Sequence, residues 1–292
     1  MPELPEVETV RRGLSSTIGE LVVGCDVRRR DVVRDRTGAA TNPRRGGIDP
    51  GSLLIGCTIS SLERHGKQLA IVGTDRAGHE RVVVVQLGMS GQLTISSEPK
   101  LQNAKHAHII WQLDQQRRII FRDARRFGGV TLLSSREDLQ HFWSSLGPDG
   151  LSVSSRQLRA GLGASKRMIK AALLDQRVLA GVGNIYADEA LHRSGIDPRS
   201  LCVNLRAAET TRLAKAIREV LRRAVDAKGS TLRDYRGADD QPGYAQLLHR
   251  VYGRGGLACP SCGSVIEQSQ IAQRTTCWCP RCQSLPEQEA NT

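Results

Sequence analysis

The stretch MPELPEVETVRRGLSSTIG, residues 1–19, sets the organisation of the chain. Four of its apolar residues repeat at helical spacing: Val7, Val10, Leu14 and Ile18. This pattern predicts an amphipathic helix over residues 5–19. Pro5 suits the first turn of such a helix, because the N–H that proline lacks would have no intrahelical partner there.

The first six residues, Met-Pro-Glu-Leu-Pro-Glu, also carry a candidate nucleophile. Removal of Met1, which a small second residue permits, would leave Pro2 with a free secondary amine. An α-amino group titrates near ~8, so much of it is uncharged near neutral pH. Its attack on a sugar C1′ would give an iminium ion. Of Glu3 and Glu6, one could then act as general acid while the other holds the amine or the helix end. A plain helix start, with acids at the positive end of the dipole, fits the same residues.

Strand patterns follow this helix, and helical patterns follow the strands. Strands are predicted at 21–29, 53–63, 67–73, 81–87, 92–96, 106–113 and 117–133, which indicates a β-sandwich or flattened barrel. Helices are predicted at 136–145, 155–162, 166–176, 184–193 and 206–227. The fold class is therefore α+β.

Composition divides the chain into five parts. We expect an N-terminal helix and β-sandwich domain, a helical domain, a mobile loop, a cysteine module and a polar tail, at 1–135, 136–230, 231–252, 253–285 and 286–292. A further polar loop with Gly and Pro is expected at 35–52.

The net charge of +12 points to a polyanionic partner, most simply nucleic acid. Ten aromatic residues in 292 argue against a broad platform for stacking single-stranded bases. No apolar run approaches the length of a membrane span and the N-terminus lacks a signal-peptide core, so a cytoplasmic protein with no membrane partner is expected. We expect a monomer.

Two Cys-x-x-Cys pairs, 16 residues apart, have the spacing of a zinc ribbon. The ligands would be Cys259, Cys262, Cys279 and Cys282. Four thiolates form a closed tetrahedral site, so the sequence predicts one structural Zn²⁺ rather than a catalytic one. Cys277 lies between the pairs but off their spacing, and it is interpreted as a small apolar residue.

Several motifs together resemble bacterial formamidopyrimidine-DNA glycosylase, in that family's order and over about residues 2–284. They are PELPEVETVRRGL at the start, HGKQL at 65–69, QLGMSGQL at 86–93, KHAHI at 105–109, RDARRFGG at 122–129, LLDQRVLAGVGNIYADEALHRSGIDP at 173–198 and QRTTCWCPRCQ at 273–283. The resemblance implies an N-terminal helix with a β-sandwich, a helix–two-turn–helix DNA-binding domain and a zinc ribbon. It also implies that the loop 231–252 covers a flipped base.

The resemblance implies an enzyme that excises oxidised purines from damaged double-stranded DNA and then cuts the strand by β,δ-elimination. Pro2 would be the Schiff-base nucleophile and Glu3 the acid that helps to open the sugar. Lys67 would donate a proton in β-elimination, and Arg274 would serve δ-elimination. It further implies a bacterial cytoplasmic protein that associates with the nucleoid through DNA.

Other family positions imply DNA contacts. The residues that would fill the space left by the flipped base are Met89, Arg125 and Phe127. Those that would contact the DNA backbone are His106, Lys166 and Asn184. Two departures stand out: the family usually has His where this chain has Gln86, and an aromatic residue where it has Cys277.

Two other functions fit the scaffold. One is an endonuclease VIII-like glycosylase for oxidised pyrimidines, against which the Met-Ser-Gly and Arg-Arg-Phe-Gly stretches argue. The other is a non-catalytic protein that binds damaged DNA, which the loss of Pro2, Glu3 or Lys67 would have supported; all three are present.

Overall fold

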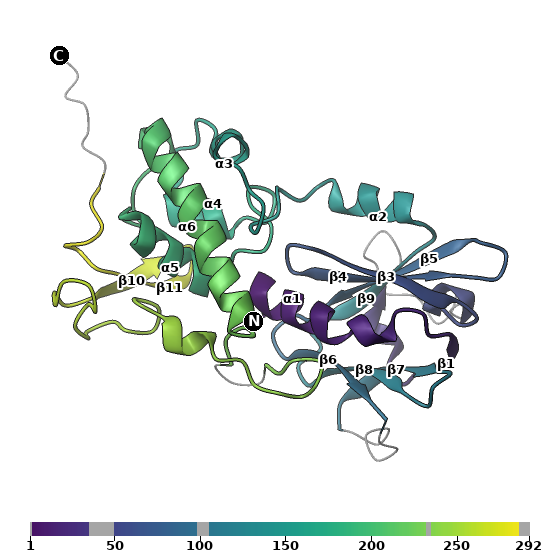
Figure 1. Ribbon diagram of the computed structural model, residues 1–292. Helices are drawn as coiled ribbons and strands as arrows, with labels where there is room; N and C mark the ends of the chain where they lie inside the picture. The colour runs from purple at the N-terminus through teal and green to yellow at the C-terminus, as the bar shows by residue number, and fades with distance from the viewer. Residues whose placement is uncertain (1, 35–49, 98–104, 232–234, 286–292) are drawn as a thin grey trace. The chain divides into compact units, whose positions relative to one another are not determined.

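The computed structural model describes residues 2–34, 50–97, 105–231 and 235–285 (Figure 1). The chain forms two compact units. The first contains residues 1–145 and 228–244, and the second contains residues 146–227 and 245–292. Most of the predicted loop 35–52 and all of the tail 286–292 lie outside the described residues.

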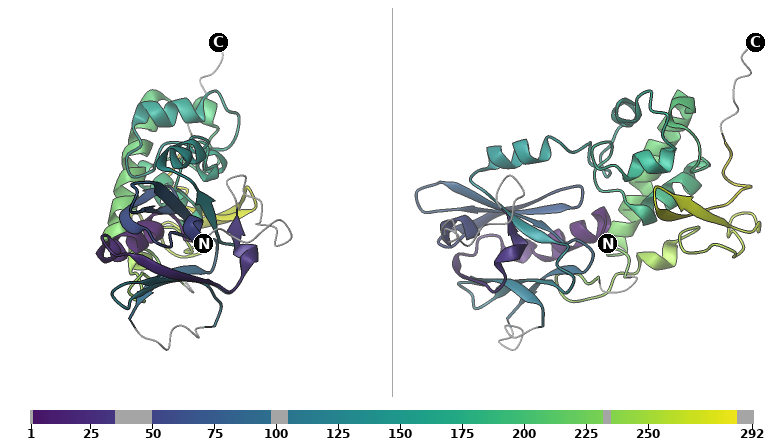
Figure 2. Two further views of the ribbon diagram at one scale, coloured as in Figure 1. Left: turned by 90° about the vertical axis from the view of Figure 1, so that its right-hand side faces the viewer. Right: turned by 180° about the vertical axis from the view of Figure 1, so that it is seen from behind.

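The first unit is a sandwich of two sheets, as predicted (Figures 1 and 2). One sheet has the strand order β1-β7-β8-β6 and the other has the order β2-β9-β5-β4-β3. Neighbouring strands are antiparallel except β2 and β9. The strands are β1 Val22–Val27, β2 Val33–Arg34, β3 Thr58–His65, β4 Gln68–Thr74, β5 Glu80–Gln86, β6 Gly91–Ser96, β7 Ala107–Leu113, β8 Arg118–Asp123 and β9 Gly129–Leu133.

Helix α1, Leu4–Gly13, contributes to the core of this sandwich. Its residues Val7, Val10 and Leu14 are buried with apolar residues of both sheets, as their spacing predicted. The predicted range 5–19 was too long. The helix ends at Gly13, the single turn η1 (Ser15–Thr17) follows, and Ile18 is 48 % exposed.

The outer face of the five-stranded sheet is covered by α2, Arg136–Trp143. Val83 and Val85 of β5 face the core between the sheets, whereas Val82 and Val84 pack with Leu139 of α2. Residues 136–145 therefore belong to the first unit, and the predicted boundary at 135 was wrong, because this sheet buries both of its faces.

Two predicted strands differ from the structure, and one strand was not predicted. The segment 117–133 is two strands, β8 and β9, separated by the loop Ala124–Gly128. The strand predicted at 53–63 begins only at Thr58, since the turn η3 (Pro50–Leu53) and a left-handed Leu54 precede it. The short β2, which follows the turn η2 (Arg30–Val32), was not predicted.

The second unit combines four helices with a two-stranded hairpin, in which α5 packs against α6 (Figure 2). The predicted helix 166–176 is shorter, because Met168 is extended and bridges to Leu201. No helix of the described residues is long and apolar enough to span a membrane. The elements are α3 Ser155–Leu162, α4 Ile169–Leu174, α5 Asn184–Ser194, η5 Cys202–Asn204, α6 Ala207–Asp226, η6 Ala245–Leu248, β10 Glu267–Ile271 and β11 Arg274–Trp278.

Glu8 holds α1 against β3. Its carboxylate is 6 % exposed and accepts hydrogen bonds from three guanidinium groups, those of Arg11, Arg12 and Arg64, at 2.8–3.0 Å. Burial opposes ionisation, but these hydrogen bonds outweigh it and lower the pKa of Glu8 to about 2. A carboxyl with a lowered folded-state pKa stabilises the fold above its unfolded pKa, and this stabilisation is lost as the pH falls toward 2.

We predict that Glu8→Gln lowers the free energy of unfolding at pH 7 by about 1–3 kcal/mol, since two or more charge-assisted hydrogen bonds are lost. The deficit should shrink at pH 3, where the native protein has also lost part of this stabilisation. Urea unfolding at both pH values measures the effect, and Glu137→Gln, on the exposed face of α2, is the matched control. An equal deficit at both pH values would contradict the assignment.

Candidate functional site

The buried carboxylate of Glu6 fixes the start of α1. The Glu3 N–H donates to Glu6 Oε2 at 2.8 Å, and the Ser230 N–H donates to Glu6 Oε1 at 2.7 Å. The Tyr235 hydroxyl donates to the Glu6 carbonyl at 3.2 Å. Gly229 has φ +77°, and a Cβ there would lie 2.9 Å from Glu6 Oε1, so this close approach requires glycine. Glu6 therefore joins the helix of the predicted nucleophile to the segment 228–244 through Oε1, while Oε2 caps the start of the helix.

Lys67 lies in a two-residue turn that joins β3 to β4. His65 pairs with Gln68 across the turn, and Gly66 supplies a positive φ of 57°. The Arg64 guanidinium donates from Nε to Glu8 Oε2 and from Nη1 to the Gly66 carbonyl, both at 3.0 Å. A single side chain thus links α1 to the backbone of the turn that carries Lys67.

Asp123, at the end of β8, is fully buried and organises two loops. Its Oδ1 accepts from the Ser90 hydroxyl at 2.6 Å and from the Arg125 N–H at 3.2 Å. Its Oδ2 accepts from the Gly128 N–H at 2.7 Å. Its own N–H donates to the His106 carbonyl at 3.1 Å. The two loops that carry Met89, Arg125 and Phe127 therefore meet at one carboxylate, and the segment of His106 binds the backbone of the same residue.

The same two loops touch backbone to backbone. A Cβ on Gly88 would lie 2.4 Å from the Gly128 nitrogen, so a side chain at that position would push the loops apart. Met89 and Phe127 extend from them and are 43 % and 56 % exposed. The Arg125 guanidinium lies 4.8 Å from the centre of the Phe127 ring. The first unit thus presents two exposed apolar side chains and a stacked cation on a rigid base.

In the second unit, one backbone carbonyl oxygen of the hairpin accepts hydrogen bonds from both the start of α5 and helix α4. The Thr275 carbonyl accepts from Asn184 Nδ2 at 3.0 Å and from Lys170 Nζ at 3.1 Å. Lys170 is fully buried and forms an ion pair with Asp188 at 2.6 Å. Arg274, next to this carbonyl, is exposed. The predicted phosphate contact and the predicted δ-elimination residue are therefore neighbours. Lys166 is exposed on the loop before α4.

The four cysteines of the two Cys-x-x-Cys pairs converge, with their ligand atoms within 4.8 Å of one another. The sulfurs of Cys262 and Cys279 are 3.4 Å apart, and those of Cys259 and Cys282 are 3.9 Å apart. Thiolates bound tetrahedrally to zinc at about 2.3 Å lie about 3.8 Å apart, so the sulfurs fit one zinc ion. Cys277 is outside this cluster and is buried in the small apolar core beside it, as its spacing predicted.

Family models match all of these parts in the same order. The formamidopyrimidine-DNA glycosylase N-terminal domain matches residues 1–130, and the H2TH domain of the same family matches residues 146–236. The zinc finger found in FPG and IleRS matches residues 256–285. A formamidopyrimidine-DNA glycosylase from Laribacter hongkongensis is 39 % identical over 97 % of this chain and 100 % of its own length. The chain belongs to the formamidopyrimidine-DNA glycosylase family.

Solved structures agree with this family assignment. The MutM (Fpg) protein from Thermus thermophilus has a TM-score of 0.80 and 37 % identity, covering 97 % of this chain and 99 % of that one. The Lactococcus lactis Fpg in complex with DNA containing an abasic site has a TM-score of 0.82 and 30 % identity, with the same coverage. As a formamidopyrimidine-DNA glycosylase the protein is a DNA glycosylase, and its ribbon holds one structural zinc ion.

Sequence reasoning missed the residues that position this family's motifs. Asp123 stood inside the quoted stretch RDARRFGG, yet nothing marked it as buried. Lys170 and Asp188 are 18 positions apart on separate helices, and no spacing rule connects them. A usable signal for Asp123 was its place before two Arg and two Gly residues, because an acid there can accept the N–H groups of a tight turn.

We predict that Asp123→Asn increases the mobility of both loops. The side-chain amide of Asn would place an N–H donor where a carboxylate oxygen of Asp123 accepts a hydrogen bond. The free energy of unfolding should fall by about 1–3 kcal/mol. Amide hydrogen exchange at Arg125 and Gly128 should accelerate more than exchange in β4. Asp114→Asn, at the exposed β7–β8 turn, is the control. Unchanged exchange at both amides would show that the loops do not depend on Asp123.

Proposed function

We propose that the protein is a bifunctional DNA-repair enzyme that excises oxidised purines, 8-oxoguanine and formamidopyrimidines, from duplex DNA and then cuts the strand by β,δ-elimination. The observation that carries this proposal is the Pro2-Glu3 start held at the first turn of α1 in a chain of this family. The Lactococcus lactis Fpg mutant solved with DNA containing Fapy-dG, 31 % identical with a TM-score of 0.81, supports the substrate class.

The chemistry begins at the Pro2 amine once Met1 has been removed. The amine forms a bond to C1′ of the damaged nucleotide as the bond from C1′ to the base breaks. The C1′–O4′ bond then breaks, and the resulting iminium ion acts as an electron sink. Glu3, 3 % exposed, supplies a proton that helps to open the sugar. The iminium ion makes the C2′ proton acidic, so the 3′ C–O bond can break by β-elimination with Lys67 as proton donor. Arg274 then assists δ-elimination at the 5′ phosphate.

The exposed side chains of the first unit serve base flipping. A damaged base must leave the stack before an amine can reach C1′, and flipping leaves a gap. Met89, Arg125 and Phe127 fill that gap, since an apolar chain, a planar cation and a ring can each insert beside bases. His106, Lys166 and Asn184 bind backbone phosphates, and the residues 231–252 cover the flipped base.

A second substrate class is oxidised pyrimidines. The wild-type Lactococcus lactis Fpg has been solved in complex with DNA containing an oxidised pyrimidine, at 30 % identity and a TM-score of 0.79. Comparing single-turnover excision of 8-oxoguanine with that of an oxidised pyrimidine, in otherwise identical duplexes, decides between the two. Faster pyrimidine excision would favour the endonuclease VIII-like function.

We predict that borohydride reduces the enzyme–DNA intermediate to a stable covalent adduct on a duplex containing 8-oxoguanine. A variant with one alanine inserted before Pro2 has an amide nitrogen in place of the amine and should form no adduct, although it should still bind the duplex. Denaturing gel electrophoresis measures the adduct. Full trapping by the inserted variant would exclude Pro2 as the nucleophile, and binding without trapping by the native enzyme would favour a non-catalytic protein.

We further predict that Arg125 reads the base opposite the lesion. An orphaned cytosine exposes O2 and N3, two adjacent acceptors that a guanidinium can satisfy, whereas adenine presents an N1 acceptor beside an N6 donor. The mismatch costs ~1–3 kcal/mol, roughly tenfold or more in rate. Excision opposite adenine would fix a mutation, so a preference for cytosine is expected.

Arg125→Ala should therefore slow excision and also narrow the preference for cytosine over adenine in single-turnover kinetics. Arg126→Ala is the matched control, because its guanidinium pairs with Asp31 at 2.8 Å rather than stacking on Phe127. Equal slowing of Arg125→Ala on both duplexes would make Arg125 a wedge or a phosphate contact and place the discrimination elsewhere.

A further inference from the structure

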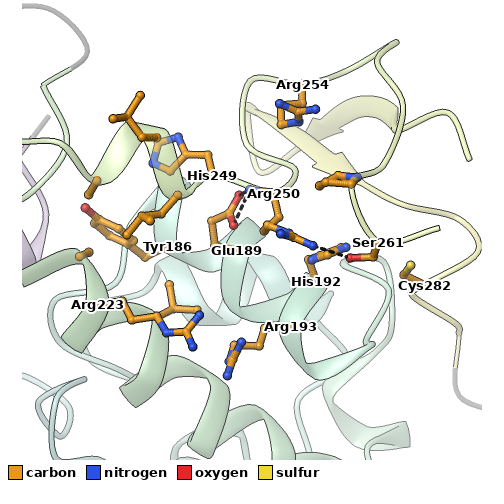
Figure 3. A pocket seen from close by; sticks show the side chains of 16 residues that line it. Tyr186, Glu189, His192, Arg193, Arg223, His249, Arg250, Arg254, Ser261 and Cys282 are labelled. Atoms are coloured by element: carbon orange, nitrogen blue, oxygen red, sulfur yellow. Dashed lines mark hydrogen bonds between the residues drawn. The ribbon is translucent and has the colours of Figure 1, made fainter. Parts of the chain in front are cut away.

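The second unit contains a pocket of about 680 Å³ whose lining includes none of the proposed catalytic residues (Figure 3). It is lined by α5, α6, η6, the segment that leads into the ribbon and the turn of the first cysteine pair. Its size is typical of sites that enclose a compact ligand or a few residues of a peptide.

Arginine side chains give this pocket its charge. Arg193 of α5, Arg223 of α6, and Arg250 and Arg254 of the segment that leads into the ribbon all line it (Figure 3). Among the described residues, Arg193 pairs with Glu219, and neither Arg223 nor Arg250 has a carboxylate within ion-pairing distance. The buried Nε of Arg254 has no hydrogen-bond partner in the described part of the chain. Four cations therefore converge where carboxylates are scarce.

The pocket's own acid does not offset this charge by ion pairing. Glu189 is 5 % exposed, and its oxygens accept from the backbone N–H groups of Arg250, Val251 and Tyr252 at 2.9–3.0 Å. Glu189 therefore binds the backbone of Arg250 and not its guanidinium, which instead donates to Ser261 Oγ, 3.0 Å away (Figure 3). Burial lowers the pKa of His249 to about 4, so this imidazole adds no positive charge to that of the arginines at neutral pH.

One wall of the pocket is apolar and open to solvent. Leu247 and Leu248 of η6 are 79 % and 49 % exposed, and Val220 and Ala224 of α6 line the pocket beside them. The single tyrosine of the lining, Tyr186, is 2 % exposed and offers no ring face for base stacking. A nucleic acid would use the arginines but leave these leucines in water, whereas a peptide with an apolar side chain between carboxylates would satisfy both.

The pocket also lies away from the predicted phosphate contact. At about 100° per residue along α5, Tyr186, Glu189 and Arg193 fall on the side opposite Asn184. We propose that this pocket binds an acidic segment of a partner protein, with an apolar side chain against Leu247 and Leu248 and flanking carboxylates on Arg223 and Arg250. This function goes beyond base excision and does not depend on it.

The test uses the zinc-loaded full-length protein and a fluorescein-labelled peptide in which leucine and phenylalanine stand between two pairs of aspartates. Fluorescence anisotropy should show saturable binding, and a peptide with serine in place of both apolar residues should bind at least roughly tenfold more weakly. Arg223→Glu and Leu247→Asp should each weaken binding of the first peptide by a similar factor.

Arg222→Glu is the matched control, because it makes the same charge change on the neighbouring exposed residue of α6, outside the pocket. It should change affinity less than about twofold. All variants should keep native zinc content and thermal midpoint. Arg222→Glu and Arg223→Glu, which lie on α6 outside residues 231–252, should also keep native borohydride trapping, which separates this site from the proposed catalysis.

Three outcomes would overturn the proposal. One is no saturable binding up to about 1 mM peptide. Another is equal weakening by Arg222→Glu and Arg223→Glu, which would reduce the effect to general attraction by the +12 chain. The third is a single-stranded oligonucleotide whose affinity falls with Arg223→Glu while the peptide's does not, which would make the pocket a nucleic-acid site.

Discussion

A carboxylate that leaves water must receive hydrogen bonds or charges to replace those it loses, and the first unit depends on this constraint. Glu8 is satisfied by guanidinium groups from α1 and β3, which fixes the helix on the sheet. Glu6 is satisfied by backbone N–H groups from the helix start and from the segment 228–244. Asp123 is satisfied by the loops on either side of it. Each acid lies beside residues of the proposed chemistry, and its hydrogen bonds restrict the conformations of the elements that carry them.

The second unit meets the same constraint with a buried ion pair and a cluster of backbone donors. Burial raises the pKa of Asp188 to about 6, against the opposing effect of Lys170, so this pair is held by geometry rather than by a large gain from charge. The ion pair specifies how these elements pack, because α4, α5 and the hairpin fit together only in the register that brings Lys170, Asp188 and the Cys277 N–H together. Glu189, one residue further along α5, does the same for the segment that enters the ribbon. One helix thereby positions the Asn184 end and the zinc module together.

The sequence predicted those parts of the fold that depend on residues close together in the chain. The helical spacing of Val7, Val10 and Leu14, and the cysteine spacing, predicted the buried face of α1 and the zinc site. The hydrophobic pattern did not reveal the break between β8 and β9, where a buried acid binds partners that include Ser90, 33 residues away. The position of α2 could have been predicted from the sequence. The unbroken run Val82–Val85 indicates a strand that is buried on both faces, and such a strand requires another element to cover the outer face of its sheet. Residues 231–252 divide between the two units, a division that composition does not reveal.

Of the eight non-glycine residues with positive φ in the described part of the chain, four lie beside proposed DNA contacts or beside Arg274. His106 and Arg126 have φ of 63° and 56°, a left-handed conformation that costs about 1–3 kcal/mol without glycine. Both residues are bonded to the backbone of Asp123, through its N–H and its carbonyl. Ala272 and Gln273, at φ 49° and 58°, form the turn before Arg274, where a two-residue hairpin favours Asn-Gly. Glycine at these positions would remove the strain, so selection for stability alone would favour glycine there. A stiffer residue costs stability but restricts the turn to fewer conformations, so Arg274 and the loop of Arg125 are held in place before DNA arrives.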